Sequence, residues 1–126
     1  MEFARGDGTT KGFWIPATAW TAGGTLFFAA KALIDDDNTD ALALISGNWS
    51  DADVTDETRG GVAYKRYGCY FPPSATSSIV SDGAESLELL GEFQFVPAGG
   101  APITFPPTDA KIAVTVWFDV KRKTIV

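Results

Sequence analysis

The sequence predicts an all-β fold built as a two-sheet sandwich, and three observations predict it. Thirteen glycines and seven prolines interrupt the chain at short intervals. The runs between them are rich in β-branched and aromatic residues, which favour strands. Helix signals are few, and six or seven short strands at this spacing are typical of two packed sheets. With 126 residues the chain is long enough for one domain with one core.

The first twenty residues are expected to form an N-terminal arm, and residues 21–126 to form the sandwich. Glycines and one proline interrupt this segment, yet its second half is strongly apolar. An ordered segment of this composition requires a covering surface, which a neighbouring subunit or a strand of the same domain would provide. Four residues of the arm are expected to anchor it to another subunit: Phe13, Trp14, Ile15 and Trp20.

Two strands are expected in the first half of the sandwich. Thr25–Ile34 places apolar side chains at alternate positions and turns Lys31 to the other side. A polar turn at 35–38 separates it from a short apolar strand at Ala41–Ser46. The expected core side chains of the first strand are Leu26, Phe28, Ala30, Ala32 and Ile34.

The middle of the chain is expected to hold one longer strand, Val62–Phe71, which is rich in tyrosine. Gly68 weakens its regularity. The segment Pro73–Ile79 then favours a single helical turn, which Ser74 could cap.

Three strands are expected near the C-terminus: Leu87–Val96, Ile103–Phe105 and Lys111–Val120. The first and last alternate apolar with polar side chains, as half-buried strands do. Gly91 falls on the apolar face of the first, where a bulge or a close crossing is expected. The expected core positions are Leu87, Leu89, Phe93 and Phe95 on the first strand, and Ile112, Val114, Val116, Phe118 and Val120 on the last.

The charge and the missing residue types exclude several classes of function. The chain has 10 basic and 16 acidic residues, a formal net charge of −6, and no histidine. Negative charge repels phosphate, so neither nucleic acid nor an anionic membrane is expected as a partner. Without histidine the usual general base and the commonest metal ligand are missing. No apolar run is long enough to span a bilayer, and no secretory signal is recognised. We therefore expect no enzymatic activity and no cofactor.

Two acidic segments and one cysteine are candidate chemical sites. The run Asp35–Asp40 and the stretch Asp51–Asp56 favour solvated turns, with a weak site for a hard cation as the alternative. Cys69 is the only cysteine, so an internal disulfide is excluded. Its place within a strand favours a small buried side chain over a reactive thiol.

Paired carboxylates and exposed aromatic residues raise two further possible functions, glycoside hydrolysis and carbohydrate binding. Glu88 and Glu92 share one face of the same strand. The rise along that strand places them about 13 Å apart, which is too far for glycoside hydrolysis. A carbohydrate-binding sandwich requires coplanar exposed aromatics, and the candidate set is Trp117 with Tyr64 or Tyr67.

Short motifs in the second half of the chain occur in a characteristic order. A turn at 73–79 precedes the strand Gly91–Val96, a hairpin tip at 99–104, and the final segments 112–116 and 119–122. In this order they resemble the immunoglobulin-like domain near the N-terminus of phage baseplate upper proteins and related virion proteins. The resemblance covers residues 62–123, with a looser match at Gly24–Ile34. The family's Gly-Asp-Thr start is close to Gly6–Thr9, which is interrupted by a glycine.

The resemblance implies a single immunoglobulin-like antiparallel β-sandwich with an extended N-terminal arm, and no catalytic residues. We therefore expect a structural or adaptor protein of a bacteriophage particle, in the tail or baseplate or in the head, assembled in the host bacterial cytoplasm. Its partners would be copies of itself and other virion proteins. The expected interface residues are Phe13, Trp14, Ile15, Trp20 and Trp117. Two alternatives stay open: a carbohydrate-binding β-sandwich module and an unrelated sandwich used for interactions at a cell surface.

Overall fold

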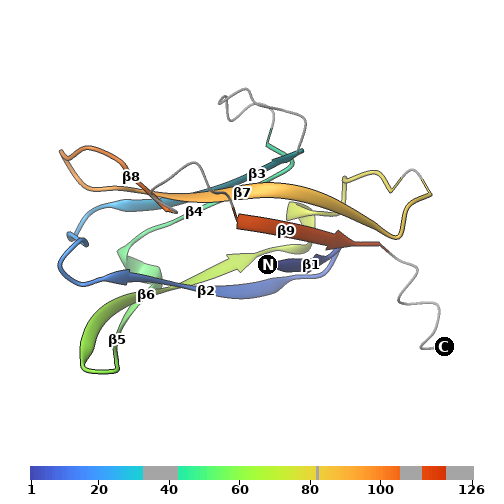
Figure 1. The fold of residues 1–126 in the computed structure, drawn as a ribbon. Helices are drawn as coiled ribbons and strands as arrows, with labels where there is room; N and C mark the ends of the chain where they lie inside the picture. The colour runs from blue at the N-terminus through green and yellow to red at the C-terminus, as the bar shows by residue number, and fades with distance from the viewer. Residues whose placement is uncertain (33–42, 82, 106–111, 119–126) are drawn as a thin grey trace.

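The computed structural model describes residues 1–32, 43–81, 83–105 and 112–118, and these form two β-sheets packed face to face (Figure 1). This confirms the expected all-β sandwich. The larger sheet has six strands within these ranges, in the order β1-β9-β7-β3-β4, and β8 pairs with β7 beyond the end of β9. Its strands are β1 (Glu2–Ala4), β3 (Thr25–Ala32), β4 (Ile45–Trp49), β7 (Ser86–Val96), β8 (Ile103–Phe105) and β9 (Ile112–Trp117).

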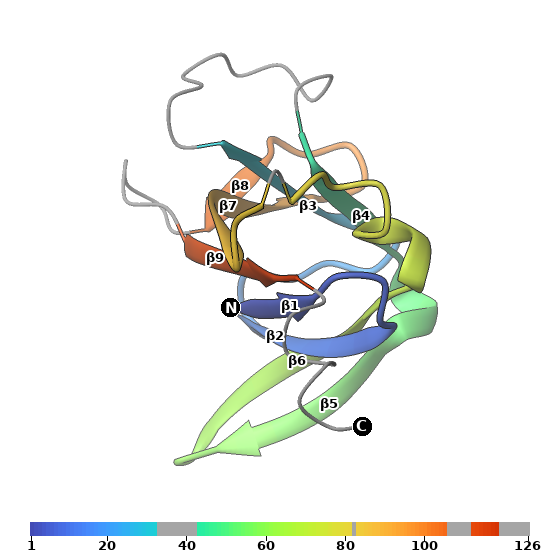
Figure 2. The ribbon, with the colours of Figure 1, turned by 90° about the vertical axis from the view of Figure 1, so that its right-hand side faces the viewer.

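The smaller sheet has the order β2-β6-β5, with β2 at Thr9–Pro16, β5 at Val54–Arg59 and β6 at Val62–Phe71. Gly60 and Gly61 form the two-residue turn that joins β5 to β6. Their φ angles are 59° and 81°, and a tight hairpin turn with positive φ at both positions favours glycine. The hairpin projects beyond the two packed sheets (Figure 2). Two short 3₁₀ turns complete the described elements, η2 (Asp51–Asp53) before β5 and η3 (Pro73–Ala75) after β6.

The strand order is the one found in immunoglobulin-type sandwiches. There, strands B, E and D of one sheet face G, F, C and C′ of the other, and here β2-β6-β5 faces β9-β7-β3-β4. A purely antiparallel sandwich was expected. The structure differs at one pairing, because β1 pairs with β9 in parallel. The N-terminus adds to this pairing, since the amino group of Met1 donates to the carbonyl oxygen of Ala113 at 3.0 Å.

Residues 1–20 are part of the sandwich, so the expected arm and the boundary at residue 20 are wrong. β1 pairs with β9 in the larger sheet, and β2 pairs with β6 along its whole length in the smaller one. These pairings satisfy main-chain groups that an isolated arm would leave to solvent. Two of the glycines that suggested an irregular segment, Gly8 and Gly12, leave room for neighbouring side chains. A Cβ at Gly12 would lie 2.9 Å from the Trp14 ring and 3.0 Å from the Arg66 guanidinium group.

Stacked aromatic rings join the two sheets at the centre of the core. Phe13 on β2 stacks on Phe93 on β7, with ring centroids 4.0 Å apart, and Phe28 on β3 lies 4.8 Å from Phe93. In antibody domains a disulfide links the corresponding strands B and F. Here the apolar rings provide the link between the sheets. Gly91 allows this packing, because a Cβ there would lie 2.9 Å from the Phe28 ring.

The alternation in the sequence places most strands and their buried faces correctly. The inward side chains of β3, β7 and β9 are those expected, and Val114, Val116 and Phe118 are buried. The strand expected at Ala41–Ser46 is instead β4 at Ile45–Trp49, and β5 was not expected. Ile34, Val120 and the Asp35–Asp40 run lie outside the described residues.

Candidate functional sites on the two outer sheet faces

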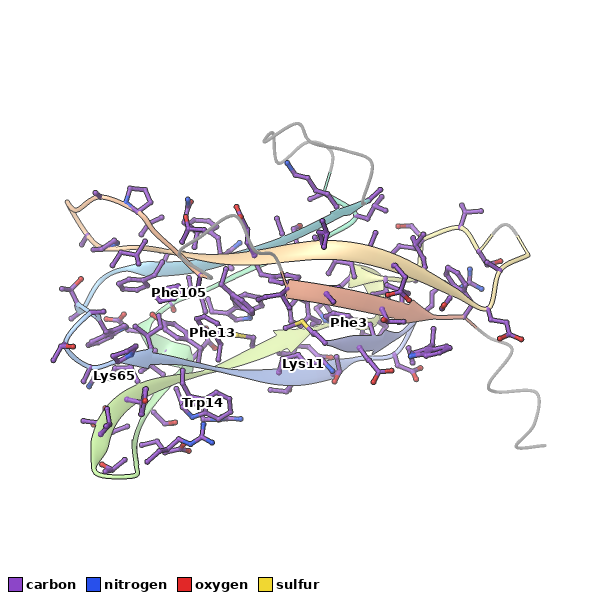
Figure 3. The ribbon with its side chains drawn as sticks, in the orientation of Figure 1. Phe3, Lys11, Phe13, Trp14, Lys65 and Phe105 are labelled. Atoms are coloured by element: carbon purple, nitrogen blue, oxygen red, sulfur yellow. The ribbon has the colours of Figure 1, made fainter. Side chains whose placement is uncertain are left out.

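Phe13, Trp14 and Ile15 are consecutive on β2, and strand alternation sends them to different sides of the smaller sheet. Ile15 is fully buried, and Phe13 stacks on Phe93 between the sheets. Figure 3 shows Phe13 between the two sheets and Trp14 on the outer side of β2. Two of the residues expected at an interface therefore belong to the core, because β2 is a strand of the sandwich.

Trp20 and Trp117 are tied to their own molecule by their indole N–H groups. Trp20 is half-buried and donates from Nε1 to the hydroxyl oxygen of Tyr67 at 2.9 Å, while the Lys65 ammonium lies 4.7 Å from the Trp20 ring centre. Burial of the Tyr67 phenol raises its pKa. Trp117, half-buried on β9, donates from Nε1 to the carboxylate of Glu2 on β1. Both tryptophans therefore connect segments of this chain.

The outer face of the smaller sheet is centred on Trp14. Its Nε1 donates to Oε2 of Glu57 at 2.7 Å. The guanidinium carbons of Arg59 and Arg66 lie 4.7 and 5.4 Å from the Trp14 ring centre. The three strands supply these groups, since Trp14 is on β2, Arg66 is opposite it on β6, and Glu57 and Arg59 are on β5. We call the outward residues of these strands the small-sheet face: Thr10, Trp14, Thr55, Glu57, Arg59, Val62, Tyr64, Arg66 and Tyr70.

Large apolar side chains remain exposed on the small-sheet face. Tyr70 is 55% exposed and Val62 is 48% exposed. Tyrosine, tryptophan and arginine are the residue types enriched at the centres of protein interfaces, where they supply most of the binding energy. The small-sheet face combines all three types on one β-sheet surface.

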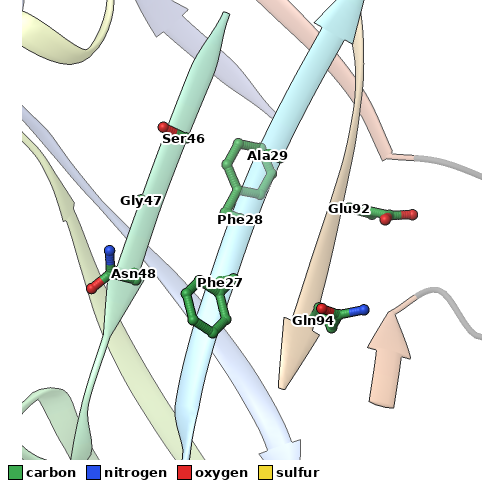
Figure 4. Close-up of a pocket in the computed structure, with 8 residues that line it drawn as sticks. All are labelled: Phe27, Phe28, Ala29, Ser46, Gly47, Asn48, Glu92 and Gln94. Carbon is green, nitrogen blue, oxygen red and sulfur yellow. The ribbon is translucent and has the colours of Figure 1, made fainter. Parts of the chain in front are cut away.

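The outer face of the larger sheet is hollowed between β4, β3 and β7 (Figure 4). Phe27 stands on β3 in the middle of this region and is 42% exposed. The strand register places Asn48 and Gln94 on either side of Phe27. We call this region the large-sheet depression. It has a volume of about 470 Å³ and is lined by Phe27, Phe28, Ala29, Ser46, Gly47, Asn48, Glu92 and Gln94.

The depression exists because small side chains lie next to Phe27 on the same face. Ala29 follows Phe27 by two positions on β3 and points to the same side. It lies opposite Ser46 of β4 on one side and Glu92 of β7 on the other. A methyl and a hydroxymethyl group fill little space beside a phenyl ring. Gly47 lies between these outward positions of β4 and faces the core, where a Cβ would lie 2.7 Å from the Trp49 ring.

The described carboxylates hold local structure. Asp53 closes a capping box with Ser50 at the start of η2, and Asp51 accepts a hydrogen bond from the Gly23 N–H at 2.8 Å. Asp56 pairs with Lys65 at 2.6 Å. Among the residues that the structure describes, no group of three or more His, Cys, Asp or Glu is placed to hold a metal ion. Glu88 and Glu92 lie on the outer face of β7 as expected, and Glu88 accepts from the Thr115 hydroxyl at 2.9 Å.

The aromatic set expected to bind sugars does not come together. Trp117 is on the outer face of the larger sheet, Tyr64 is on the smaller sheet, and Tyr67 is fully buried. Sequence patterns alone did not single out Phe27, Asn48 and Gln94 as candidate site residues. The expected alternation in Thr25–Ile34 already places Phe27 outwards, but their proximity depends on which strands become neighbours.

Cys69 is buried in the core, as its position in a strand predicted. Burial, with a further contribution from the negative charge of Asp53, raises the pKa of its thiol to about 12. The thiolate is the reactive form, so this side chain is unreactive near neutral pH.

Comparisons with family models, with curated proteins and with solved structures find no match to this chain. Within the described residues, no helix has both the length and the apolar character needed to cross a membrane. The candidate sites are therefore defined by their own geometry and chemistry.

Proposed function

We propose that this protein is a non-enzymatic structural or adaptor protein of a bacteriophage particle, in the tail or baseplate or in the head, and that it acts by subunit assembly. The observation that carries the proposal is the small-sheet face, where two arginines lie against Trp14 and an exposed tyrosine, Tyr70, stands farther along the same face. The resemblance of residues 62–123 to virion immunoglobulin-like domains supports the phage context.

Trp14 is well suited to the centre of an interface because its ring is already held in place. Glu57 fixes the indole N–H, and Arg59 and Arg66 lie against the ring. A side chain fixed before binding loses little conformational entropy when a partner covers it. Its guanidinium neighbours can then pair with carboxylates of a partner.

The partners in this proposal are copies of this chain and other virion proteins. The net charge of −6 favours solubility before assembly. An outward face that includes Arg59 and Arg66 offers a local attraction for acidic surfaces of the same or another subunit. In a symmetric particle, many modest contacts act together, so that each single interface can be weak.

Sedimentation of the purified chain over a wide concentration range tests this proposal. We expect self-association that weakens in Trp14→Ala and in Arg66→Glu, with both variants still folded. Trp117→Ala is the matched control, because it removes a half-buried tryptophan from the opposite sheet. A strict monomer at the highest concentration would contradict self-assembly. Equal weakening by Trp117→Ala would show that the small-sheet face is not the interface.

A further inference from the structure

We propose that the large-sheet depression binds a neutral saccharide, with the Phe27 ring as the platform for one sugar ring and with Asn48 and Gln94 binding its hydroxyl groups. This site is on the opposite sheet from the small-sheet face and does not depend on the proposed assembly. It also differs from the aromatic set that the sequence suggested.

Phe27 is a large apolar side chain that stays exposed on the outer sheet face. Its neighbour Phe28 is 2% exposed in the core, whereas Phe27 is 42% exposed on the outside. The outward Trp14 is covered by two guanidinium groups, but none of the described side chains places a ring or a cation against Phe27. The apolar C–H face of a pyranose ring can cover such a phenyl ring without displacing another group.

The polar groups beside Phe27 are side-chain amides. Asn48 and Gln94 are its direct cross-strand neighbours, and such neighbours have Cβ atoms about 4.5–5.5 Å apart. An amide offers both a donor and an acceptor, which matches the paired hydroxyl groups of a sugar. Within the described part of the chain Asn48 makes no side-chain hydrogen bond. Gln94 donates from Nε2 to the Thr104 hydroxyl at 3.5 Å, which orients the amide and leaves its carbonyl oxygen as an acceptor.

The shape and charge of the depression also suit a small neutral ligand. Its volume of about 470 Å³ lies within the range of about 300–1,000 Å³ typical of small-molecule sites. Ala29 and Ser46 form a low floor beside the ring, and Ser46 adds a hydroxyl group. The lining has one carboxylate, Glu92, and no basic side chain. This lining disfavours phosphate and acidic sugars and suits a ligand that is rich in hydroxyl groups and uncharged.

The test is binding of the full chain to an array that carries neutral hexose and N-acetylhexosamine oligosaccharides together with sialylated and phosphorylated ones. Neutral glycans that bind are then titrated by calorimetry. We expect Phe27→Ala to weaken this binding about tenfold or more, and Phe27→Tyr to keep it. Asn48→Ala and Gln94→Ala should each weaken it as well, because each loses hydrogen bonds to the ligand.

Trp117→Ala is again the matched control, since Trp117 is on the same sheet face but outside the depression. Binding lost in Trp117→Ala and retained in Phe27→Ala would overturn the proposal, as would an array that shows no binding or binds only acidic glycans. Melting temperatures identify any variant that fails to fold, and the two amide variants then replace Phe27→Ala. Sedimentation of Phe27→Ala should match that of the wild type, which separates this site from the proposed assembly face.

Discussion

Two pairs of adjacent aromatic residues, Phe13-Trp14 on β2 and Phe27-Phe28 on β3, have the same sequence pattern and different surroundings. In each pair one ring turns inwards and packs on Phe93, from the smaller sheet at 4.0 Å and from the larger sheet at 4.8 Å. The other ring turns outwards. Alternation along a strand therefore decides the side of the sheet in both cases.

The outward rings differ because their neighbouring strands supply different side chains. β5 and β6 bring Arg59 and Arg66 to Trp14, and long arginine side chains can lie along an aromatic surface. β4 and β7 bring the shorter amides Asn48 and Gln94 to Phe27, and these leave the ring exposed. The residue types across the strand thus determine whether an outward ring packs against cations of its own sheet or stays uncovered.

The largest effect is expected from a charge placed on the inward side of a strand. Val116 on β9 is fully buried, so Val116→Asp would place an unpaired carboxylate in the core. We expect this variant not to fold, because burying such a group costs several kcal/mol, comparable to the whole stability of a small domain. Circular dichroism and solubility on expression measure the outcome.

Ala113→Asp on the same strand is the control for Val116→Asp. Ala113 points outwards and is exposed, so its variant should fold and melt within a few degrees of the wild type. A soluble, cooperatively melting Val116→Asp protein would mean that the two faces of β9 are assigned the wrong way round.

An intermediate effect on the free energy of unfolding is expected when Phe13 or Trp14 is replaced by alanine. Phe13→Ala removes the ring stacked on Phe93 and should lower the free energy of unfolding by about 2–4 kcal/mol. Trp14→Ala loses the hydrogen bond to Glu57 and two cation–ring contacts, which together contribute about 1–2 kcal/mol. Urea denaturation of both variants measures the difference, and a larger loss in Trp14→Ala would contradict the inward and outward assignment.

At neutral pH the smallest effect is expected from Cys69, because its ionisation changes the stability only above pH 9. Its thiol pKa is raised from 9.0 to about 12 in the folded protein, so the unfolded chain loses this proton first as the pH rises. The associated stability is present below pH 9 and is lost as the pH rises towards 12. The melting temperature of Cys69→Ala should therefore fall less steeply above pH 9 than that of the wild type. Burial also raises the phenol pKa of Tyr67, and the negative charge of the Cys69 thiolate adds to that rise, so part of the difference between the two curves comes from Tyr67. Parallel curves would show that Cys69 is not protected from solvent.

The strands that the sequence missed are those whose partners lie far away in the chain or whose two faces are both polar. β1 pairs with β9 across more than a hundred residues, as the contact of Met1 with Ala113 shows. β5 has no buried residue, because its hairpin with β6 projects beyond the packed sheets (Figure 2). Cross-strand ion pairs such as Lys65–Asp56 support it, and hydrophobic alternation contains no sign of them.

The sequence by itself determined the all-β class, the buried faces of β3, β7 and β9, and the burial of Cys69, because side chains alternate along a strand whatever its neighbours are. Only the tertiary structure decided that residues 1–20 belong to the sheets and that β3 lies between β4 and β7. The physical reason is that hydrogen bonding between strands joins segments distant in sequence. The groups around Trp14 and Phe27 therefore come together only once the sheets have formed.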